Sequence, residues 1–196
     1  MNKIQEYKQD PTLLWNDFRD GDEIAFTVLF DLYSDALFRY GIKFVIDDDL
    51  VKDCIQDLFI KLHKNRANLA PTNNPLLYLF KALKNSIIDS LEAKDSRITY
   101  FPQDELPFWV DYRLNDQSSE DNDKDEEIRE LFNKVIKMLT PRQKEAVYLH
   151  YQSELSYEEI AQLLEINCQS VRNLVHRAVE KIRTEMNFNL FCIYLF

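Results

Sequence analysis

Hydrophobic residues recur every three or four positions in several segments of the chain, a spacing that predicts helices with one buried face each. In the first half these stripes run over residues 28–40, 50–62 and 76–91. A shorter helix is predicted to begin at Asp10-Pro11, because an aspartate cap followed by proline is a typical helix start. Its apolar side chains are Leu14, Trp15 and Phe18. The first half is therefore predicted to form a small helical domain.

Helical spacing returns between residues 128 and 151. It is broken at Thr140, before a proline, and this threonine is predicted to cap the second of two helices. Residues 156–178, "SYEEIAQLLEINCQSVRNLVHRA", then show the pattern of two short helices joined by a tight turn at "LEIN". Ser156 opens a capping box with Glu159 at the start of the first of these helices.

Residues 96–127 lack this periodicity and are predicted to be a linker. The chain has a formal net charge of −10, and this stretch alone holds ten acidic and three basic residues. It begins with a group of aromatic residues and ends in "NDQSSEDNDKDEE". The acidic end is typical of a solvated, self-repelling tract, whereas the aromatic part is apolar enough to dock on a folded domain.

The content of glycine, cysteine and histidine limits the fold classes and the kinds of site that this chain can form. The two glycines, Gly21 and Gly41, exclude glycine-rich phosphate loops and Asn-Gly hairpins, which favours an all-α fold. The three cysteines are far apart and no histidine stands at a ligand spacing, so neither a disulfide framework nor a metal site is predicted. No nucleophile with a suitable partner indicates catalysis, and we expect no enzymatic activity and no cofactor. No secretory signal or membrane-spanning run is evident, and we expect a cytoplasmic protein.

The second helix of the 156–178 pair carries residues suited to DNA recognition on its polar face. A helix in the major groove needs short or forked polar side chains near its start for base edges, and cations further along for phosphates. The candidates for base edges are Gln169, Ser170, Arg172 and Asn173, and those for phosphates are His176, Arg177, Lys181 and Arg183. The alternative is a solvent-facing helix with an ordinary mixture of charges. The turn, the capping box and the small Ala161 at the helix crossing favour a helix-turn-helix.

Residues 76–91 present a second candidate surface for nucleic acid. Tyr78, Lys81, Lys84 and Asn85 are predicted to lie on the polar flank of this helix. Aromatic and basic residues together suit an unstacked single strand, whose bases stack on rings and whose phosphates meet lysines. The alternative is a core helix that happens to carry two lysines.

Taken in order, these segments resemble a bacterial sigma factor of the extracytoplasmic-function (ECF) type, the small class that keeps only sigma domains two and four. "GDEIAFTVLFDLYSDALFRY" is similar to the first conserved helix of the family, "VKDCIQDLFIKLHKNR" to its polymerase-binding helix, and "LYLFKALKNSIIDSL" to the helix that engages the −10 promoter element. "LTPRQKEAVYLHY" and the helix-turn-helix after it resemble domain four, which reads the −35 element.

The resemblance implies two small helical domains joined by an acidic linker, the C-terminal one a helix-turn-helix. Domain two would span 10–95, the linker 96–127, domain four 128–186, and an apolar tail 187–196. Such a protein binds core RNA polymerase and directs promoter recognition, promoter melting and transcription initiation. Its partners would be core polymerase, promoter DNA and an anti-sigma factor.

The resemblance also assigns residues to these roles. The implied polymerase contacts are Asp53, Gln56, Asp57, Phe59 and Lys61. The implied −10 contacts are Arg66, Asn68, Asn73, Asn74, Tyr78, Lys81, Lys84 and Asn85. The implied −35 contacts are Gln169, Ser170, Arg172, Asn173, His176, Arg177 and Lys181.

The chain departs from the family pattern in two respects. His63 stands where an aromatic residue, often tryptophan, is common. "SELSY" and "LEIN" lack the glycines that are usual before and within the turn. Asn167 can adopt the left-handed backbone that a glycine would otherwise supply, because asparagine tolerates it better than most residues.

Two other classes of protein match part of the sequence. A regulator with the output domain of quorum-sensing and response regulators opens on a pattern close to "LTPRQKEAV", but residues 15–95 show no βα alternation to support it. A helical interaction module would bind polymerase or an anti-sigma partner without reading DNA. The overall acidity favours such a module, and the basic face of the last helix disfavours it.

Overall fold

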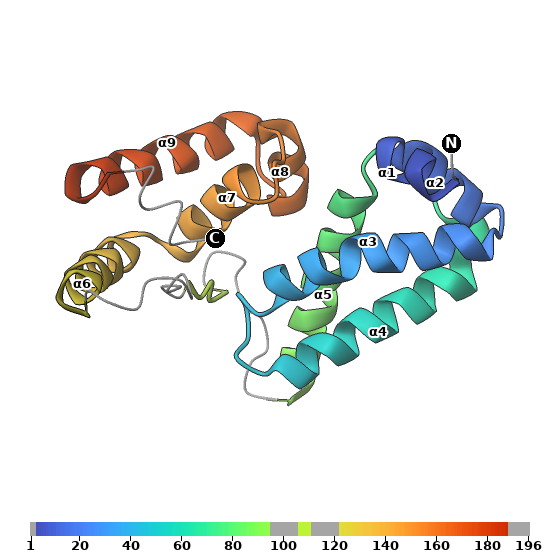
Figure 1. Ribbon diagram of the computed structural model, residues 1–196, viewed down its shortest axis with the longest axis horizontal. Helices are drawn as coiled ribbons and strands as arrows, with labels where there is room; N and C mark the ends of the chain where they lie inside the picture. The colour runs from blue at the N-terminus through green and yellow to red at the C-terminus, as the bar shows by residue number, and fades with distance from the viewer. Residues whose placement is uncertain (1–2, 95–105, 111–121, 188–196) are drawn as a thin grey trace. The chain divides into compact units, whose positions relative to one another are not determined.

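The computed structural model describes residues 3–94, 106–110 and 122–187, with side chains for all of these except 94 and 122–129. They belong to two compact units, one within residues 1–101 and the other within 102–196. All regular secondary structure in the described ranges is helical (Figure 1). The predicted all-α fold is therefore confirmed for this part of the chain.

The first unit is built on three long helices that pack against one another. Its elements are α1 (Lys3–Gln9), α2 (Pro11–Arg19), α3 (Glu23–Gly41), α4 (Asp48–Asn65), the 3-10 turn η1 (Arg66–Asn68) and α5 (Pro75–Lys94). Each of α3, α4 and α5 contacts the other two, and Figure 1 shows α3 and α4 running side by side. The four helices predicted in this half are present, and α1 is an additional helix that the hydrophobic pattern does not predict.

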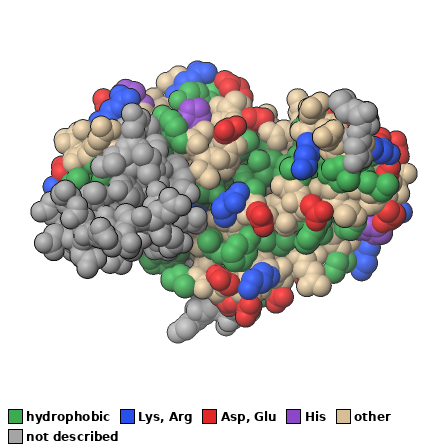
Figure 2. Space-filling model, viewed as in Figure 1, with side chains coloured by type: hydrophobic (Ala, Val, Ile, Leu, Met, Phe, Trp, Pro, Cys, Tyr) green, Lys and Arg blue, Asp and Glu red, His purple; other side chains and the backbone are tan. Residues whose placement is uncertain are grey.

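Aspartate side chains start three of these helices. Asp10, Asp22 and Asp47 stand at the N-caps of α2, α3 and α4, where each carboxylate accepts hydrogen bonds from backbone N–H groups of the first turn. Pro11 follows Asp10 at the first helical position, as predicted. The acidic run at residues 47–49 is exposed, and Figure 2 shows acidic side chains gathered where α4 begins.

Helices α3 and α4 approach each other closely at Gly41, the last residue of α3. A Cβ atom added there would lie 2.6 Å from Cγ1 of Val51 in α4, closer than packed atoms can stand. Val51 is fully buried, so it cannot move aside into solvent. The glycine therefore sets the distance between α3 and α4.

The additional helix α1 is held by one buried tyrosine and one ion pair. Tyr7 is fully buried, and its hydroxyl donates to Oδ2 of Asp17 at 2.6 Å. Burial, followed by the bond to Asp17, raises the pKa of Tyr7 to about 12. Lys3 pairs with the carboxylate of Asp22. That pair, with the backbone N–H of Ala25, lowers the pKa of Asp22 to about 2.

Replacing Asp22 with asparagine is expected to remove stability only where the carboxylate is charged. Because the pKa of Asp22 is lower in the folded state, its contribution is present above pH ~4 and is lost as the pH falls toward 2. The stability difference between wild type and Asp22→Asn should therefore be constant from pH 5 to 7 and shrink below about pH 4. Urea unfolding followed by Trp15 fluorescence in a Trp109→Phe background measures it, and a difference that does not change with pH contradicts this assignment.

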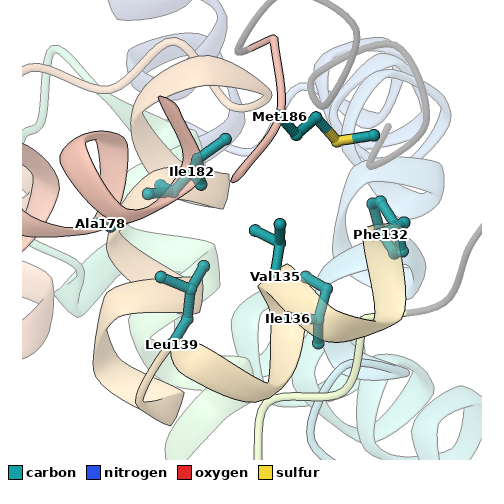
Figure 3. Packing of buried hydrophobic residues seen from close by; sticks show 8 residues of the cluster. Phe132, Val135, Ile136, Leu139, Ala178, Ile182 and Met186 are labelled. Atoms are coloured by element: carbon teal, nitrogen blue, oxygen red, sulfur yellow. The ribbon is translucent and has the colours of Figure 1, made fainter. Parts of the chain in front are cut away.

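The last helix of the second unit packs against the other three. Its elements are residues 106–110, α6 (Asn122–Met138), α7 (Pro141–Tyr151), α8 (Tyr157–Leu164) and α9 (Cys168–Glu185). The helix α9 contacts α6, α7 and α8. Side chains from α6, α7 and the end of α9 form one buried cluster, most of it labelled in Figure 3: Phe132, Val135, Ile136, Leu139, Val147, Ala178, Ile182 and Met186.

The segment predicted to be a linker over 96–127 is shorter in the structure. Leu106 and Phe108 are buried, and the Phe108 ring lies 5.7 Å from that of Tyr148 in α7. The helix predicted to begin at Ile128 already begins at Asn122, because carboxylates favour the first turns of a helix. The rest of the expected linker and the expected apolar tail from 188 onward lie outside the described residues.

The predicted cap at Thr140 and the predicted capping box at Ser156 are confirmed in the second unit, and Thr140 also forms a capping box that was not predicted. The boxes pair Thr140 with Gln143 and Ser156 with Glu159. The left-handed backbone is adopted by Glu154 (φ 54°) and Glu165 (φ 56°), which lie in "SELSY" and "LEIN". In "LEIN" the left-handed residue is therefore Glu165 and not Asn167, whose backbone is extended and whose Oδ1 accepts from the N–H of Ser170 at 2.7 Å as the N-cap of α9.

The left-handed backbone at Glu154 lowers the stability of the fold, because a side chain disfavours this conformation. A glycine at this position would not have this cost. A side chain disfavours this conformation by about 1–2 kcal/mol, and glycine adopts it freely. We expect Glu154→Gly to be more stable than Glu154→Ala by about 1 kcal/mol, since both remove the charge and only glycine relieves the backbone. Thermal unfolding of the two variants measures the difference. Equal stability, or a less stable glycine variant, contradicts the strain at this position.

Candidate nucleic-acid interface

The helices α8 and α9 form a pair whose apolar faces are buried and whose turn has three residues. In α8 the buried residues are Ile160, Leu163 and Leu164, and in α9 they are Val171, Val175, Ala178, Val179 and Ile182. The backbone N–H groups of Glu165 and Ile166 both donate to the carbonyl oxygen of Ala161, which ends α8. Because the apolar stripe of α9 is fixed against its neighbours, the opposite face of that helix is also fixed.

Most of the residues predicted for the −35 element lie on this opposite face. Gln169, Arg172, Asn173, His176 and Arg177 are exposed, and Ser170 is half-buried. The side-chain amide of Gln169 donates to Oδ1 of Asn173 at 3.2 Å, and Nδ1 of His176 lies 3.4 Å from Glu180. Ser170, Asn173 and Arg177 also line an open hollow of about 410 Å³ between α7 and α9. The structure therefore brings these six side chains together along one helix.

Arg172 is oriented by the first turn of α8. Its Nη2 donates to Oε1 of Glu158 at 3.1 Å, and its guanidinium lies 5.9 Å from the ring centre of Tyr157. The thiol of Cys168 donates to the same carboxylate oxygen at 3.2 Å. The thiol and then the arginine lower the pKa of Glu158, and the same hydrogen bond raises the pKa of Cys168. Arg172 is therefore the base-contact candidate whose position depends on a second helix.

The prediction that Lys181 is available for phosphates is corrected by the structure. Its Nζ donates to the carbonyl oxygen of Met138 at 2.8 Å and to Oε1 of Gln143 at 3.2 Å. Both acceptors stand where α6 ends and α7 begins. Lys181 thus ties α9 to that junction, because unpaired backbone carbonyls at a helix end attract a cation.

The residues predicted for the −10 element lie on α5 and on the segment between α4 and α5. Tyr78, Lys81 and Asn85 are exposed and share one face of α5, three and four residues apart. Asn68 and Asn73 are exposed in the preceding segment. A hollow of about 180 Å³ lies beside Tyr78. All five side chains are therefore accessible at the surface of the first unit.

Two other residues predicted to contact the −10 element form hydrogen bonds to the backbone at helix ends. Asn74 accepts at Oδ1 from the N–H of Leu77 at 3.0 Å, at the start of α5. Arg66 donates from Nη1 to the carbonyl oxygen of His63 at 2.8 Å, at the end of α4. Both side chains are half-buried. They hold the ends of the segment that carries Asn68 and Asn73.

The prediction that Lys84 lies on the polar flank of α5 is wrong. Only 4% of the residue is exposed, and its ammonium lies 5.4 Å from the ring centre of Phe44. A lysine can bury its long alkyl stem while its charge faces an aromatic ring. Lys84 is therefore part of the packing of the first unit and is not presented to a nucleic acid.

Sequence reasoning missed two contacts that hold the same segment from α2. The indole Nε1 of Trp15 donates to the carbonyl oxygen of Ala70 at 2.9 Å, and Nε of Arg19 donates to that of Leu69 at 2.6 Å. The apolar pattern marks Trp15 only as a core residue. The available signal was chemical, because a buried tryptophan N–H needs an acceptor.

The residues predicted to bind polymerase all lie on α4, and all of them except Phe59 are exposed. Asp53, Gln56, Asp57 and Lys61 are exposed. Phe59, in contrast, is only 3% exposed, and its ring packs against those of Phe30 at 4.9 Å and Phe26 at 6.2 Å. The prediction that Phe59 contacts polymerase directly is therefore corrected. Its buried ring supports the exposed surface of α4 from within.

An apolar hollow of about 520 Å³ adjoins these polar residues. It lies between α3 and α4 and is lined by Phe30, Ser34, Asp35, Phe38, Lys52, Ile55 and Gln56. Phe30 is 42% exposed, which is unusual for a large aromatic residue. The sequence does not indicate this exposure, because Phe30 directly follows apolar residues of α3 that are buried.

His63 occupies the position where the family pattern commonly has an aromatic residue. Its ring packs edge-on against that of Phe26 at 4.8 Å, and its Nε2 lies 3.3 Å from Oε1 of Glu23. The imidazole therefore fills the place of an aromatic ring and adds a polar contact to α3.

Neither a metal site nor a membrane-spanning helix is present among the residues that the structure describes. No group of three or more histidine, cysteine or acidic side chains in these ranges is placed to hold a metal ion. Among the described helices, none has the length and apolar character needed to cross a bilayer.

Comparison with protein families supports the division into two functional regions. Residues 29–97 match the family described as sigma-70 region 2, and residues 129–182 match the one described as sigma-70, region 4. Together these matches cover more than half of the chain. The first includes α4 and α5 with the segment between them, and the second includes the α8–α9 pair.

Curated relatives are similar over most of their length. The RNA polymerase sigma-E factor of Streptomyces avermitilis is 24% identical over 85% of this chain and 87% of its own. The RNA polymerase sigma-H factor of Pseudomonas aeruginosa is 28% identical over 83% and 86%. The ECF RNA polymerase sigma factor SigW of Bacillus subtilis is 22% identical over 86% and 92%.

Solved structures share the fold. The sigma factor RpoE in complex with the anti-sigma factor NepR from Bartonella quintana has a TM-score of 0.55 at 21% identity, over 79% of this chain and 92% of that one. CnrH in complex with the cytosolic domain of CnrY has a TM-score of 0.57 at 18% identity, over 88% and 94%.

Proposed function

This chain belongs to the sigma-70 family, as a sigma factor of the ECF type with domains two and four that directs promoter recognition for RNA polymerase, and we propose how its surfaces divide that work. The observation that carries the proposal is the pair of exposed polar faces, one on each unit, within the matches to sigma-70 regions 2 and 4. The match to region 2 also removes the alternative of a quorum-sensing or response regulator, which has no such region.

The exposed face of α9 is proposed to read the −35 element in the major groove. Gln169, Arg172 and Asn173 stand near the start of the helix, where base edges are contacted, and His176 and Arg177 follow toward the phosphates. Arg172 suits a guanine, because its guanidinium can donate two parallel hydrogen bonds. Glu158 would keep it near this position until DNA is bound.

Loss of the Arg172 side chain tests this assignment. We expect Arg172→Ala to reduce −35-dependent transcription roughly tenfold, since one base contact is worth about 1–3 kcal/mol. Core polymerase binding should be unchanged. The matched control is Lys137→Ala, which removes one exposed positive charge from α6 of the same unit. Equal losses in the two variants, or a parallel loss of polymerase binding, contradict a specific role for Arg172.

The exposed face of α5 and the segment before it are proposed to engage the melted −10 element. The Tyr78 ring offers a stacking surface for an unstacked base, and the hollow beside it offers space. Lys81 supplies a positive charge, and Asn68, Asn73 and Asn85 supply amide donors and acceptors. This chemistry suits single-stranded DNA better than duplex, because stacking needs a base that has left the helix.

The polar residues of α4 and the adjoining apolar hollow are proposed to bind core polymerase. Asp53, Gln56 and Asp57 would form the polar rim and the Phe30 hollow the apolar centre, which is the usual division of a protein interface. A helical element of polymerase with apolar side chains and basic flanks would fit this surface.

The Phe30 side chain is expected to contribute most to that interface. Partly exposed aromatic residues at the centre of an interface often cost more than about 1 kcal/mol when truncated, so Phe30→Ala should weaken core binding roughly tenfold. Ile46→Ala is the control, because Ile46 is 79% exposed and lies outside the hollow. Binding titrations with purified core polymerase compare the two. If Phe30→Ala binds as tightly as Ile46→Ala, the hollow is not the contact.

An anti-sigma factor is proposed as a further partner. Two proteins with this fold are seen in complexes with partner proteins, the sigma factor RpoE with the anti-sigma factor NepR and CnrH with the cytosolic domain of CnrY. The proposed site of action is the cytoplasm, where polymerase and promoters are found. We propose no enzymatic activity, since a sigma factor recognises DNA as a subunit of polymerase.

A further inference from the structure

We propose that α2 positions the −10 surface, with Trp15 and Arg19 holding the segment between η1 and α5 in the shape that receives the melted strand. The inference rests on the proposed −10 role of that segment and of α5. It concerns residues outside the sigma-70 region 2 match, which begins at residue 29. Trp15 and Arg19 are positioning residues, acting through the segment and through Tyr78.

The two side chains fix two successive peptide groups of this segment. Trp15 donates to the carbonyl oxygen of Ala70, and Arg19 donates to that of Leu69. Residues 69–74 have no regular secondary structure, so no helical hydrogen-bond ladder holds these carbonyls. Because Trp15 and Arg19 are four residues apart on α2, they face the segment from the same side. One helix therefore acts on both carbonyls as a rigid template.

The donors are themselves held in place. Trp15 is fully buried, and its ring packs against that of Phe18 at 5.7 Å. Arg19 makes a second hydrogen bond, from Nη1 to Oδ1 of Asn16 at 3.3 Å. A large buried ring and a guanidinium held by two hydrogen bonds have few alternative conformations. The geometry that they impose on residues 69–70 is therefore constant.

Trp15 also supports the proposed stacking platform. The Tyr78 ring lies 5.2 Å from the Trp15 ring, and 38% of Tyr78 is exposed. One side of Tyr78 is therefore supported by the core, and the other is open to a base. The same tryptophan thus contacts both parts of the −10 surface, the irregular segment and the start of α5.

Holding these parts in advance lowers the cost of binding the strand. An irregular segment that is disordered in the free protein must be ordered on binding, and this subtracts from the observed affinity. Residues 69–70 and Tyr78 are already fixed here. Removing the hydrogen bonds should therefore weaken binding to the −10 strand, although neither Trp15 nor Arg19 belongs to the proposed DNA-contacting set.

Two conservative substitutions separate this role from a purely structural one. Trp15→Phe keeps an aromatic ring in the core and removes the N–H donor. Arg19→Lys keeps the positive charge and removes the Nε donor. The matched controls are Trp109→Phe, at a half-exposed tryptophan of the second unit, and Arg39→Lys, at an exposed arginine of α3.

Each variant is assembled with core polymerase and titrated with a single-stranded oligonucleotide carrying the non-template −10 element of a promoter identified by run-off transcription. Loss of one hydrogen bond, worth about 1 kcal/mol, predicts roughly fivefold weaker binding for Trp15→Phe and for Arg19→Lys. Discrimination against a strand with one altered −10 base should fall as well. Affinity for core polymerase and for a −35 duplex should match the controls.

Unchanged −10 affinity and discrimination in both variants would overturn the proposal. A fall in −10 affinity accompanied by an equal fall in core binding would also overturn it, because that pattern indicates general damage to the first unit. If the wild-type holoenzyme itself fails to bind the −10 strand, the proposed function of the segment is wrong. That outcome is distinguished by the wild-type titration alone.

Discussion

Burial of a single apolar stripe on each helix determines which side chains remain at the surface of both units. In the second unit, α9 packs that stripe against three other helices, and its rotation about its own axis is thereby fixed. Gln169, Arg172 and Asn173 face outward as a direct consequence. The DNA-facing surface proposed here is therefore maintained by the core behind it, and a change in Val175 or Ala178 would move the whole set at once.

The same constraint shapes the first unit. The stripe of α5 turns Tyr78, Lys81 and Asn85 outward and places Lys84 against Phe44. On α4 it turns Gln56 and Asp57 outward and places Phe59 among other aromatic rings. Residues at the edge of a stripe can face either way, and their chemical type does not decide which. For this reason Lys84 is buried although a lysine is usually exposed, and Phe59 is buried although the resemblance implies a direct contact with polymerase.

Helix positions and caps were predictable from the sequence because they depend on local chemistry. Apolar spacing and cap residues identified eight of the described α-helices, and Asp10, Thr140 and Ser156 start helices as their side chains predict. The turns were less predictable, since Glu154 and Glu165 adopt a conformation that their type disfavours. Contacts between distant residues were not predictable. The bond from Trp15 to Ala70 joins residues 55 apart, and no local pattern reports it.

This acidic chain is proposed to gain its promoter specificity as a subunit of polymerase. Few positive charges lie on the exposed face of α9, so stable binding to DNA by the chain alone is not expected at physiological salt. Run-off transcription with purified core polymerase on double-stranded genomic fragments tests this most directly. We expect discrete transcripts only when the chain and core polymerase are both present. Binding to duplex DNA without polymerase, or binding to polymerase without any transcript from the fragments, would contradict the account.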